Sequence, residues 1–146
     1  MSKMKSKFKY MFDAAPASQL IAKDEIAKTA SFTGTAKVLD VLEGYWTSGE
    51  LADDVFAVAI NVLAADLSSD EEYVLNLEAG PVGFATSLVI GTVKIAGTGQ
   101  YVILVDADTV KAQKADAAAI RLVGDVSGTT PSITLHAWIA GRIVGH

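Results

Sequence analysis

The stretch that decides the fold is Val55-Phe56-Ala57-Val58-Ala59-Ile60-Asn61-Val62-Leu63. Large apolar side chains occupy every second position from Phe56 to Val62, and alanine or asparagine occupies the positions between them. Successive side chains of a β-strand point to opposite faces, so this period of two predicts a strand with large residues on one face and small ones on the other. The small residues indicate that the second face is also covered, by another sheet or another chain.

Similar short segments, each bounded by turn residues, lie on both sides of this strand. We expect strands at residues 35–42, 73–79, 88–95, 101–105, 119–125 and 132–144. The polar connection at 106–117 has room for one turn of helix, and Gly97-Thr98-Gly99 predicts a hairpin turn. Short strands separated by turn signals about every ten residues are typical of an antiparallel β-sandwich or a small barrel. Long amphipathic helices are missing, which argues against alternating βα units and a parallel sheet.

The bulk composition is that of one folded domain. The chain has 146 residues, of which 51% are hydrophobic and 20% charged, so it can bury a real core and is not disordered as a whole. There is no cysteine, which excludes disulfides, thiolate nucleophiles and cysteine-ligated metals. No apolar run reaches the roughly 20 residues of a membrane span, and lysines interrupt any signal-peptide core near the start. We therefore expect a protein made in the cytoplasm and without a membrane partner.

The first residues carry a charge pattern of their own. The net charge is −5, and four lysines precede the first acidic residue, Asp13, so the remainder of the chain carries −9. An acidic body argues against direct nucleic-acid binding, which needs clustered Lys and Arg. We predict an extended N-terminal arm over residues 1–33 and a β-sandwich over 34–146.

The arm allows two interpretations. It is either a solvated tail or a segment that docks on a partner chain. In the second interpretation, lysines on one face of an extended strand meet carboxylates while aromatic side chains fill pockets. The predicted partner-contact residues are Lys3, Lys5, Lys7, Phe8, Lys9, Tyr10 and Phe12.

The end of the arm is itself ambiguous. Residues 18–28 fit a short helix with Ser18 as the N-cap and with Leu20 and Ile26 on one side. An extended segment lying on a neighbour fits the same residues equally well.

The sequence contains almost no candidate catalytic groups. The two histidines are His136, on the outward face of the last strand, and His146, the last residue. No Cys–His pair or His-Glu-x-x-His motif is present, and acidic pairs such as Asp70-Glu71 fall in turns, where a solvated carboxylate is the simpler interpretation than a cation ligand. No serine lies in a nucleophile elbow. We therefore predict no catalytic residue, no cofactor and no metal site, and we expect that the protein is not an enzyme.

Three segments carry a resemblance to a known family. They are Met11-Phe12-Asp13, then Asp70-Glu71-Glu72-Tyr73-Val74-Leu75-Asn76-Leu77, and then the C-terminal run Ala119-Ile120-Arg121-Leu122 with Val126-Ser127-Gly128-Thr129-Thr130-Pro131-Ser132-Ile133 and Ala137-Trp138-Ile139. This pattern resembles the capsid cement or decoration proteins of small phage heads, of the type first seen in a Bordetella podophage. The chain departs from that pattern at residues 78–85, where the family has a polar stretch.

The resemblance implies a β-sandwich or jelly-roll subunit on the outer surface of an icosahedral head. Such a subunit would bridge major capsid protein subunits and act as a homo-oligomer, with a trimer favoured and a dimer as the alternative. Two other functions remain open. One is a different virion component, such as a head-fibre base or a tail protein. The other is a carbohydrate-binding module that would use Tyr45, Trp46 and Trp138 as its aromatic platform.

Overall fold

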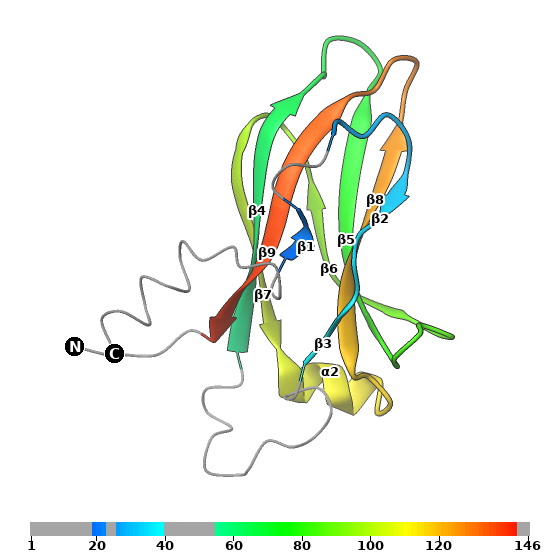
Figure 1. Ribbon diagram of the computed structural model, residues 1–146, viewed down its shortest axis with the longest axis vertical. Coiled ribbons are helices and arrows are strands. Elements are labelled where there is room, and N and C mark those ends of the chain that lie inside the picture. The colour runs from blue at the N-terminus through cyan, green and yellow to red at the C-terminus, as the bar shows by residue number, and fades with distance from the viewer. Residues whose placement is uncertain (1–18, 23–25, 40–54, 143–146) are drawn as a thin grey trace, which may run out of the picture.

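The computed structural model is a sandwich of two antiparallel β-sheets, and among the residues that it describes a single short helix lies at one end (Figure 1). It describes residues 19–22, 26–39 and 55–142, with the backbone alone for residues 141 and 142. The all-β fold class expected from the sequence is confirmed. The elements are β1 (Gln19–Ile21), β2 (Phe32–Thr33), β3 (Lys37–Val38), β4 (Val55–Ala65), β5 (Glu72–Gly80), β6 (Leu88–Lys94), β7 (Gly99–Asp106), α2 (Ala107–Gln113), β8 (Ala119–Ser127) and β9 (Ile133–Arg142).

The strand order is that of a jelly roll. One sheet, called sheet A here, has the order β1-β9-β4-β7, and the other, sheet B, has the order β2-β8-β5-β6. Strands β2 and β3 both pair with β8, so they act as one interrupted strand along its free side. When β2 and β3 are counted as one strand, the described strands number eight in chain order. Sheet A then has the order 1-8-3-6 and sheet B has the order 2-7-4-5, which is the pair of interlocked Greek keys of a jelly roll.

Strand β4 occupies the centre of sheet A, as its sequence predicts. Phe56, Val58, Ile60 and Val62 all point into the core between the sheets and are almost completely buried. The core is closed from the other side by the inward residues of β5, which include Tyr73 and Leu77. The branched aliphatic side chains on facing strands therefore supply most of the apolar burial that stabilises the fold.

Of the two alternatives for residues 18–28, the helix is wrong for the described part, which is extended. Gln19–Ile21 is the edge strand β1 of sheet A, paired with β9. A register shift between Gln19 and Ile21 lets Leu20 and Ile21 both turn inward, where they are 0% and 2% exposed. Burial of two adjacent apolar residues against the sandwich outweighs a weak local preference for helix.

The sandwich therefore includes residues before Gly34. Strands β1 and β2 lie within the range 1–33 that the sequence assigns to an arm, and each is an edge strand of one sheet. The predicted strand at 35–42 is represented by β3, and its residues 40–42 lie outside the described residues.

The turn at Gly97-Thr98-Gly99 is not a hairpin. It joins β6 in sheet B to β7 in sheet A, so the strands on either side of it belong to different sheets. The hydroxyl of Tyr101 holds this corner, since it donates to the Gly97 carbonyl at 2.8 Å and accepts the N–H of Ala96 at 3.0 Å. Glycine and local polarity signal a turn, but they carry no information about which sheet the next strand joins.

The helical turn expected in the connection at 106–117 is confirmed as α2. Asp106 is its N-cap, and its carboxylate accepts the N–H of Asp108 at 3.1 Å. Val110 and Ala107 are buried, so the helix closes one end of the core (Figure 1). Within the described residues, no helix is long and apolar enough to cross a membrane.

Candidate interaction surface

All seven predicted partner-contact residues lie outside the described residues. The set comprises Lys3, Lys5, Lys7, Phe8, Lys9, Tyr10 and Phe12. Their role in partner binding stays a prediction. The described residues offer a second candidate surface, on the side of sheet A that faces away from the core.

The outward side of sheet A has an apolar centre. Strand pairing places Gln19 beside Trp138, Trp138 beside Ala59, and Ala59 beside Val102, in a row across the whole sheet. The neighbouring row places Ala57 beside Leu104. We call this surface the outer face of sheet A and define it by the residues Ala57, Ala59, Val102, Leu104, His136 and Trp138.

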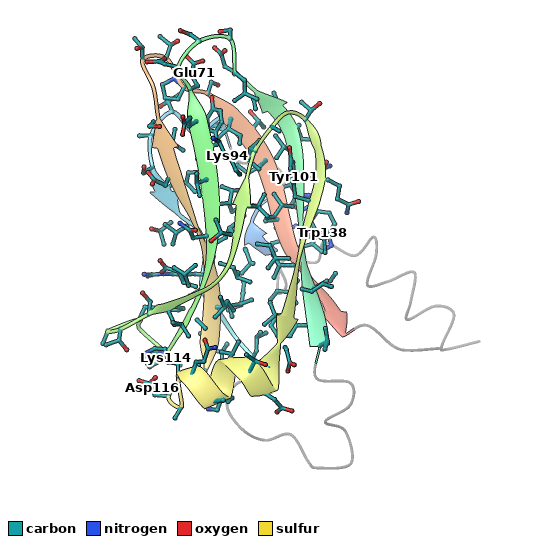
Figure 2. All side chains as sticks on the ribbon, turned by 180° about the vertical axis from the view of Figure 1, so that it is seen from behind. Glu71, Lys94, Tyr101, Lys114, Asp116 and Trp138 are labelled. Carbon is teal, nitrogen blue, oxygen red and sulfur yellow. The ribbon has the colours of Figure 1, made fainter. Side chains whose placement is uncertain are left out.

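The two sides of the outer face of sheet A differ in exposure. Val102 and Leu104, on the edge strand β7, are 52% and 61% exposed. Trp138, on β9, is only 7% exposed although it points away from the core (Figure 2). The alanine side chains of β4 project only a methyl group from the centre of the face. They therefore leave room beside them for a large neighbouring ring.

His136 and Trp138 form an aromatic pair on this face. Their ring centroids are 4.6 Å apart, and the planes are inclined by 33°. Both side chains are 7% exposed, so the expected outward position of His136 is confirmed, but its side chain is buried. The indole N–H of Trp138 is buried and makes no hydrogen bond within the described part of the chain. A buried donor without an acceptor is unusual in a native protein.

Polar residues flank the apolar centre at both ends of β7. Asn61 and Gln100 pair across β4 and β7 at one end of the face, and Asp106 ends β7 at the other. An apolar centre with a polar rim is the usual anatomy of a protein–protein interface.

The outward side of sheet B has a different chemistry. Arg121 donates to the Glu78 carboxylate at 3.0 Å and stacks over the ring of Phe84 at 4.3 Å. Thr92 donates to the Asn76 side chain at 2.8 Å. The polar groups on this side bond to each other, as on an ordinary solvated surface. The outward faces of the two sheets are therefore chemically distinct.

The acidic turn between β4 and β5 has a structural role. Asp70 accepts the backbone N–H of Thr129 at 3.0 Å and the Thr129 hydroxyl at 2.9 Å, and these two bonds, in that order, lower the pKa of its carboxyl group. Glu71, labelled at the end of the sandwich opposite α2 in Figure 2, is 4% exposed and accepts the N–H of Ser69 at 2.9 Å. The interpretation as a freely solvated turn is therefore wrong for Glu71. The carboxylates of this turn hold the adjacent β8–β9 connection in place.

The described residues contain no cluster of His, Asp or Glu side chains arranged to hold a metal ion. The acidic pair of Asp106 and Asp108 is accounted for by the N-cap of α2.

The exposed residues of β7 were not singled out as a functional site by sequence reasoning. The signal was present, because residues 101–105 are apolar at nearly every position instead of at every second one. A strand that is apolar on both faces has one face for the core and a second face that requires another cover.

Comparison with protein-family models, with curated proteins and with solved structures finds no match for this chain.

Proposed function

We propose that this chain is a structural, non-enzymatic virion protein. It binds the outer surface of an icosahedral phage head and bridges neighbouring major capsid protein subunits. The observation that carries the proposal is the outer face of sheet A, an apolar sheet surface with a polar rim on a jelly-roll body. The resemblance of the C-terminal strands to capsid cement proteins directs the proposal to the phage head.

Binding of this kind stabilises a capsid by linkage. A protein that binds the assembled lattice and not the free subunits shifts the equilibrium toward the lattice. An oligomer, for which a trimer is favoured over a dimer, engages several sites at once, so each single contact can be weak. Bridging of subunits therefore needs no catalytic group.

The N-terminal residues are proposed as part of the contact with the major capsid protein. Lys3, Lys5, Lys7 and Lys9 alternate along the chain, as does the aromatic set Phe8, Tyr10 and Phe12, so that in an extended conformation the two sets lie on opposite faces. The lysines would meet carboxylates of the capsid surface. Such pairing is screened by salt, so attachment should weaken as ionic strength rises.

Co-sedimentation with phage heads tests this proposal. Labelled protein is mixed with heads that lack it, and bound protein is measured in the pellet. We expect saturable binding to assembled heads and little binding to unassembled major capsid protein. A chain that lacks residues 1–10 should bind more weakly than the full chain. Equal binding of the two chains would remove the arm from the contact, and no binding of the full chain would overturn the proposal.

Electron microscopy of labelled particles separates the nearest alternative. Label over the head surface agrees with a cement protein, whereas label on the tail would assign the chain to a tail component. The carbohydrate-binding alternative is disfavoured because Trp138, one of its three aromatic candidates, is 7% exposed and offers no open ring face for a sugar. Tyr45 and Trp46 lie outside the described residues.

A further inference from the structure

Strand β7 is an edge strand whose outward side chains are exposed. Within the described residues it pairs with β4 alone, and all eight of its residues are matched to β4 without a register shift. Its outward residues Gln100, Val102, Leu104 and Asp106 are all exposed. An edge strand leaves a row of backbone N–H and C=O groups unpaired on its open side, and such a row is a template for a further strand.

The other edges of the two described sheets are protected against pairing. Strand β1 has three residues, and β2 and β3 have two each. Strand β6 carries a bulge at Ile90, where the register shifts opposite Leu77 and Glu78, and it ends at Lys94. Short strands, bulges and lysines all hinder edge-to-edge pairing. Strand β7 has no bulge against β4, and residues 99–106 include no lysine or proline.

We propose that β7 pairs antiparallel with β7 of a second copy of this chain. The two four-stranded sheets A then form one continuous sheet across a two-fold axis that passes beside Ile103. Two identical antiparallel edges close on such an axis, so this contact favours a dimer over the trimer that the family resemblance favours. The pairing goes beyond the proposed function and does not depend on it.

The residues of β7 are complementary to themselves in this register. With Ile103 opposite Ile103 of the second copy, Val102 lies opposite Leu104 of that copy, and Gln100 lies opposite its Asp106. The first pair joins two apolar side chains, and such cross-strand pairs stabilise a sheet. In the second pair the Gln100 amide donates to a carboxylate, which has further acceptor sites beside the one that accepts the N–H of Asp108.

The neighbouring registers match less well. The axis moves in steps of one whole residue, because only every second residue of β7 directs its backbone groups to the open side. An axis beside Val102 would place Gln100 opposite Leu104. An axis beside Leu104 would place Val102 opposite Asp106. Each of these arrangements sets a polar group against an apolar side chain, so the register centred on Ile103 is favoured.

The charge of the strand also permits a second copy. Asp106 is the one charged residue of β7, and in the proposed register it does not face another carboxylate. The pairing uses backbone groups that lie in the plane of the sheet. The outward side chains therefore stay on the outer face of sheet A, and the dimer presents this face twice on one continuous surface.

The contact is small, so the dimer should be weak. Eight residues a side fall short of the roughly 20–30 residues a side of a standard interface. We expect a dissociation constant of about 1–100 micromolar. Sedimentation velocity of the full chain alone, at concentrations that bracket this range, measures the equilibrium between monomer and dimer.

Two substitutions at the edge test the contact. Val102→Lys and Leu104→Glu should each raise the dissociation constant about tenfold or more, because each sets a charge against an apolar side chain of the second copy. Val38→Lys is the matched control. Val38 is 51% exposed and Val102 is 52% exposed, but Val38 belongs to β3, at the far edge of sheet B. This variant should dimerise as the wild type does, and far-UV circular dichroism checks that all variants fold.

The double variant Val102→Lys/Leu104→Glu tests the register. In the proposed pairing each lysine lies opposite a glutamate of the second copy, so the double variant should dimerise about tenfold more tightly than either single variant. Added salt should weaken this dimer and not the wild-type dimer. In the register centred on Val102 the two lysines would face each other, and in the one centred on Leu104 the two glutamates would do so, so neither would give this recovery.

Three results would overturn the inference. They are a wild-type chain that stays monomeric at every concentration, equal losses in Val102→Lys and Val38→Lys, and no recovery in the double variant. A monomeric chain whose Val102→Lys variant no longer binds phage heads would instead assign the edge of β7 to a strand of the major capsid protein. Because sedimentation uses the chain alone, failure of the dimer and failure of head binding are separate results.

Discussion

Tyr73 joins two connections between the sheets through a single hydroxyl group. Its side chain is 0% exposed, and the hydroxyl donates to the Asp66 carbonyl at 2.7 Å and lies 3.0 Å from the Ser132 carbonyl. It also accepts the N–H of Ser132 at 2.9 Å. The β4–β5 and β8–β9 connections are therefore held together from inside the core.

Removal of this hydroxyl should cost measurable stability. We expect Tyr73→Phe to lower the free energy of unfolding by about 1–3 kcal/mol, because buried backbone groups lose their partner. Urea denaturation measures the change. Tyr101→Phe is the control, since its hydroxyl lies at a more exposed corner, and it should cost about 1 kcal/mol or less. Equal losses in both variants would contradict the special role of Tyr73.

Asp70 makes the same end of the sandwich sensitive to acid. Hydrogen bonds from Thr129 lower the pKa of Asp70, and those from the hydroxyl and N–H of Ser68 lower the pKa of Asp66. A carboxyl group whose pKa is lower in the folded state stabilises that state above the unfolded value of about 3.9. This contribution is lost as pH falls through the folded pKa.

Thermal unfolding between pH 6 and pH 2.5 checks this dependence. We expect Asp70→Asn to lower Tm at pH 6 and to show a smaller fall in Tm below pH 4 than the wild type. Asp125→Asn, a change on an exposed position of β8, should affect Tm at pH 6 less. Parallel pH profiles for wild type and Asp70→Asn would rule out the assignment.

At the scale of elements, the interrupted edge strand of sheet B depends on a glycine. Phe32 of β2 pairs with Gly124 of β8, and its ring occupies the space where a side chain at position 124 would be. Gly124 faces the core beside Leu75, so the Phe32 ring fills part of the core that β8 leaves empty. This packing attaches the β2 segment to the sandwich.

A double-mutant cycle tests this packing. Gly124→Ala should lower the free energy of unfolding by about 1–3 kcal/mol, because the added methyl group collides with the Phe32 ring. Phe32→Leu alone should also destabilise, since it removes buried area. In combination, the smaller leucine makes room for the methyl group, so the two losses should be less than additive. Strict additivity in urea denaturation would show that the two positions are not coupled.

At the scale of the whole molecule, the strand order makes most pairings non-local. Among the named strands, only β5 and β6 are neighbours both in sequence and in a sheet. Strand β1 pairs with β9, so the two ends of the described chain must meet before sheet A is complete. Forming such contacts requires closure of long loops, which costs entropy before the pairing is gained.

Refolding should therefore be slow. We expect rates in the range of milliseconds to seconds, typical of all-β domains dominated by non-local pairing. Stopped-flow fluorescence of Trp138 in the Trp46→Phe background measures this rate. Refolding within microseconds would be incompatible with formation of both sheets in the measured step.

Local patterns in the sequence are enough to predict the class of the fold and much of its core. Alternation in residues 55–63 identified β4 and its buried face, and similar patterns located β5 to β9, because the period of a strand is a local property of the chain. The pairing of β1 with β9, the jelly-roll order and the sheet change at Gly97-Thr98-Gly99 depend on contacts between residues distant in sequence. These features are visible in the folded chain and not in any local stretch of sequence. The tertiary structure also joins Ala59, Val102 and Trp138, which come from three different strands, into one apolar face, since strand pairing and not sequence proximity makes them neighbours.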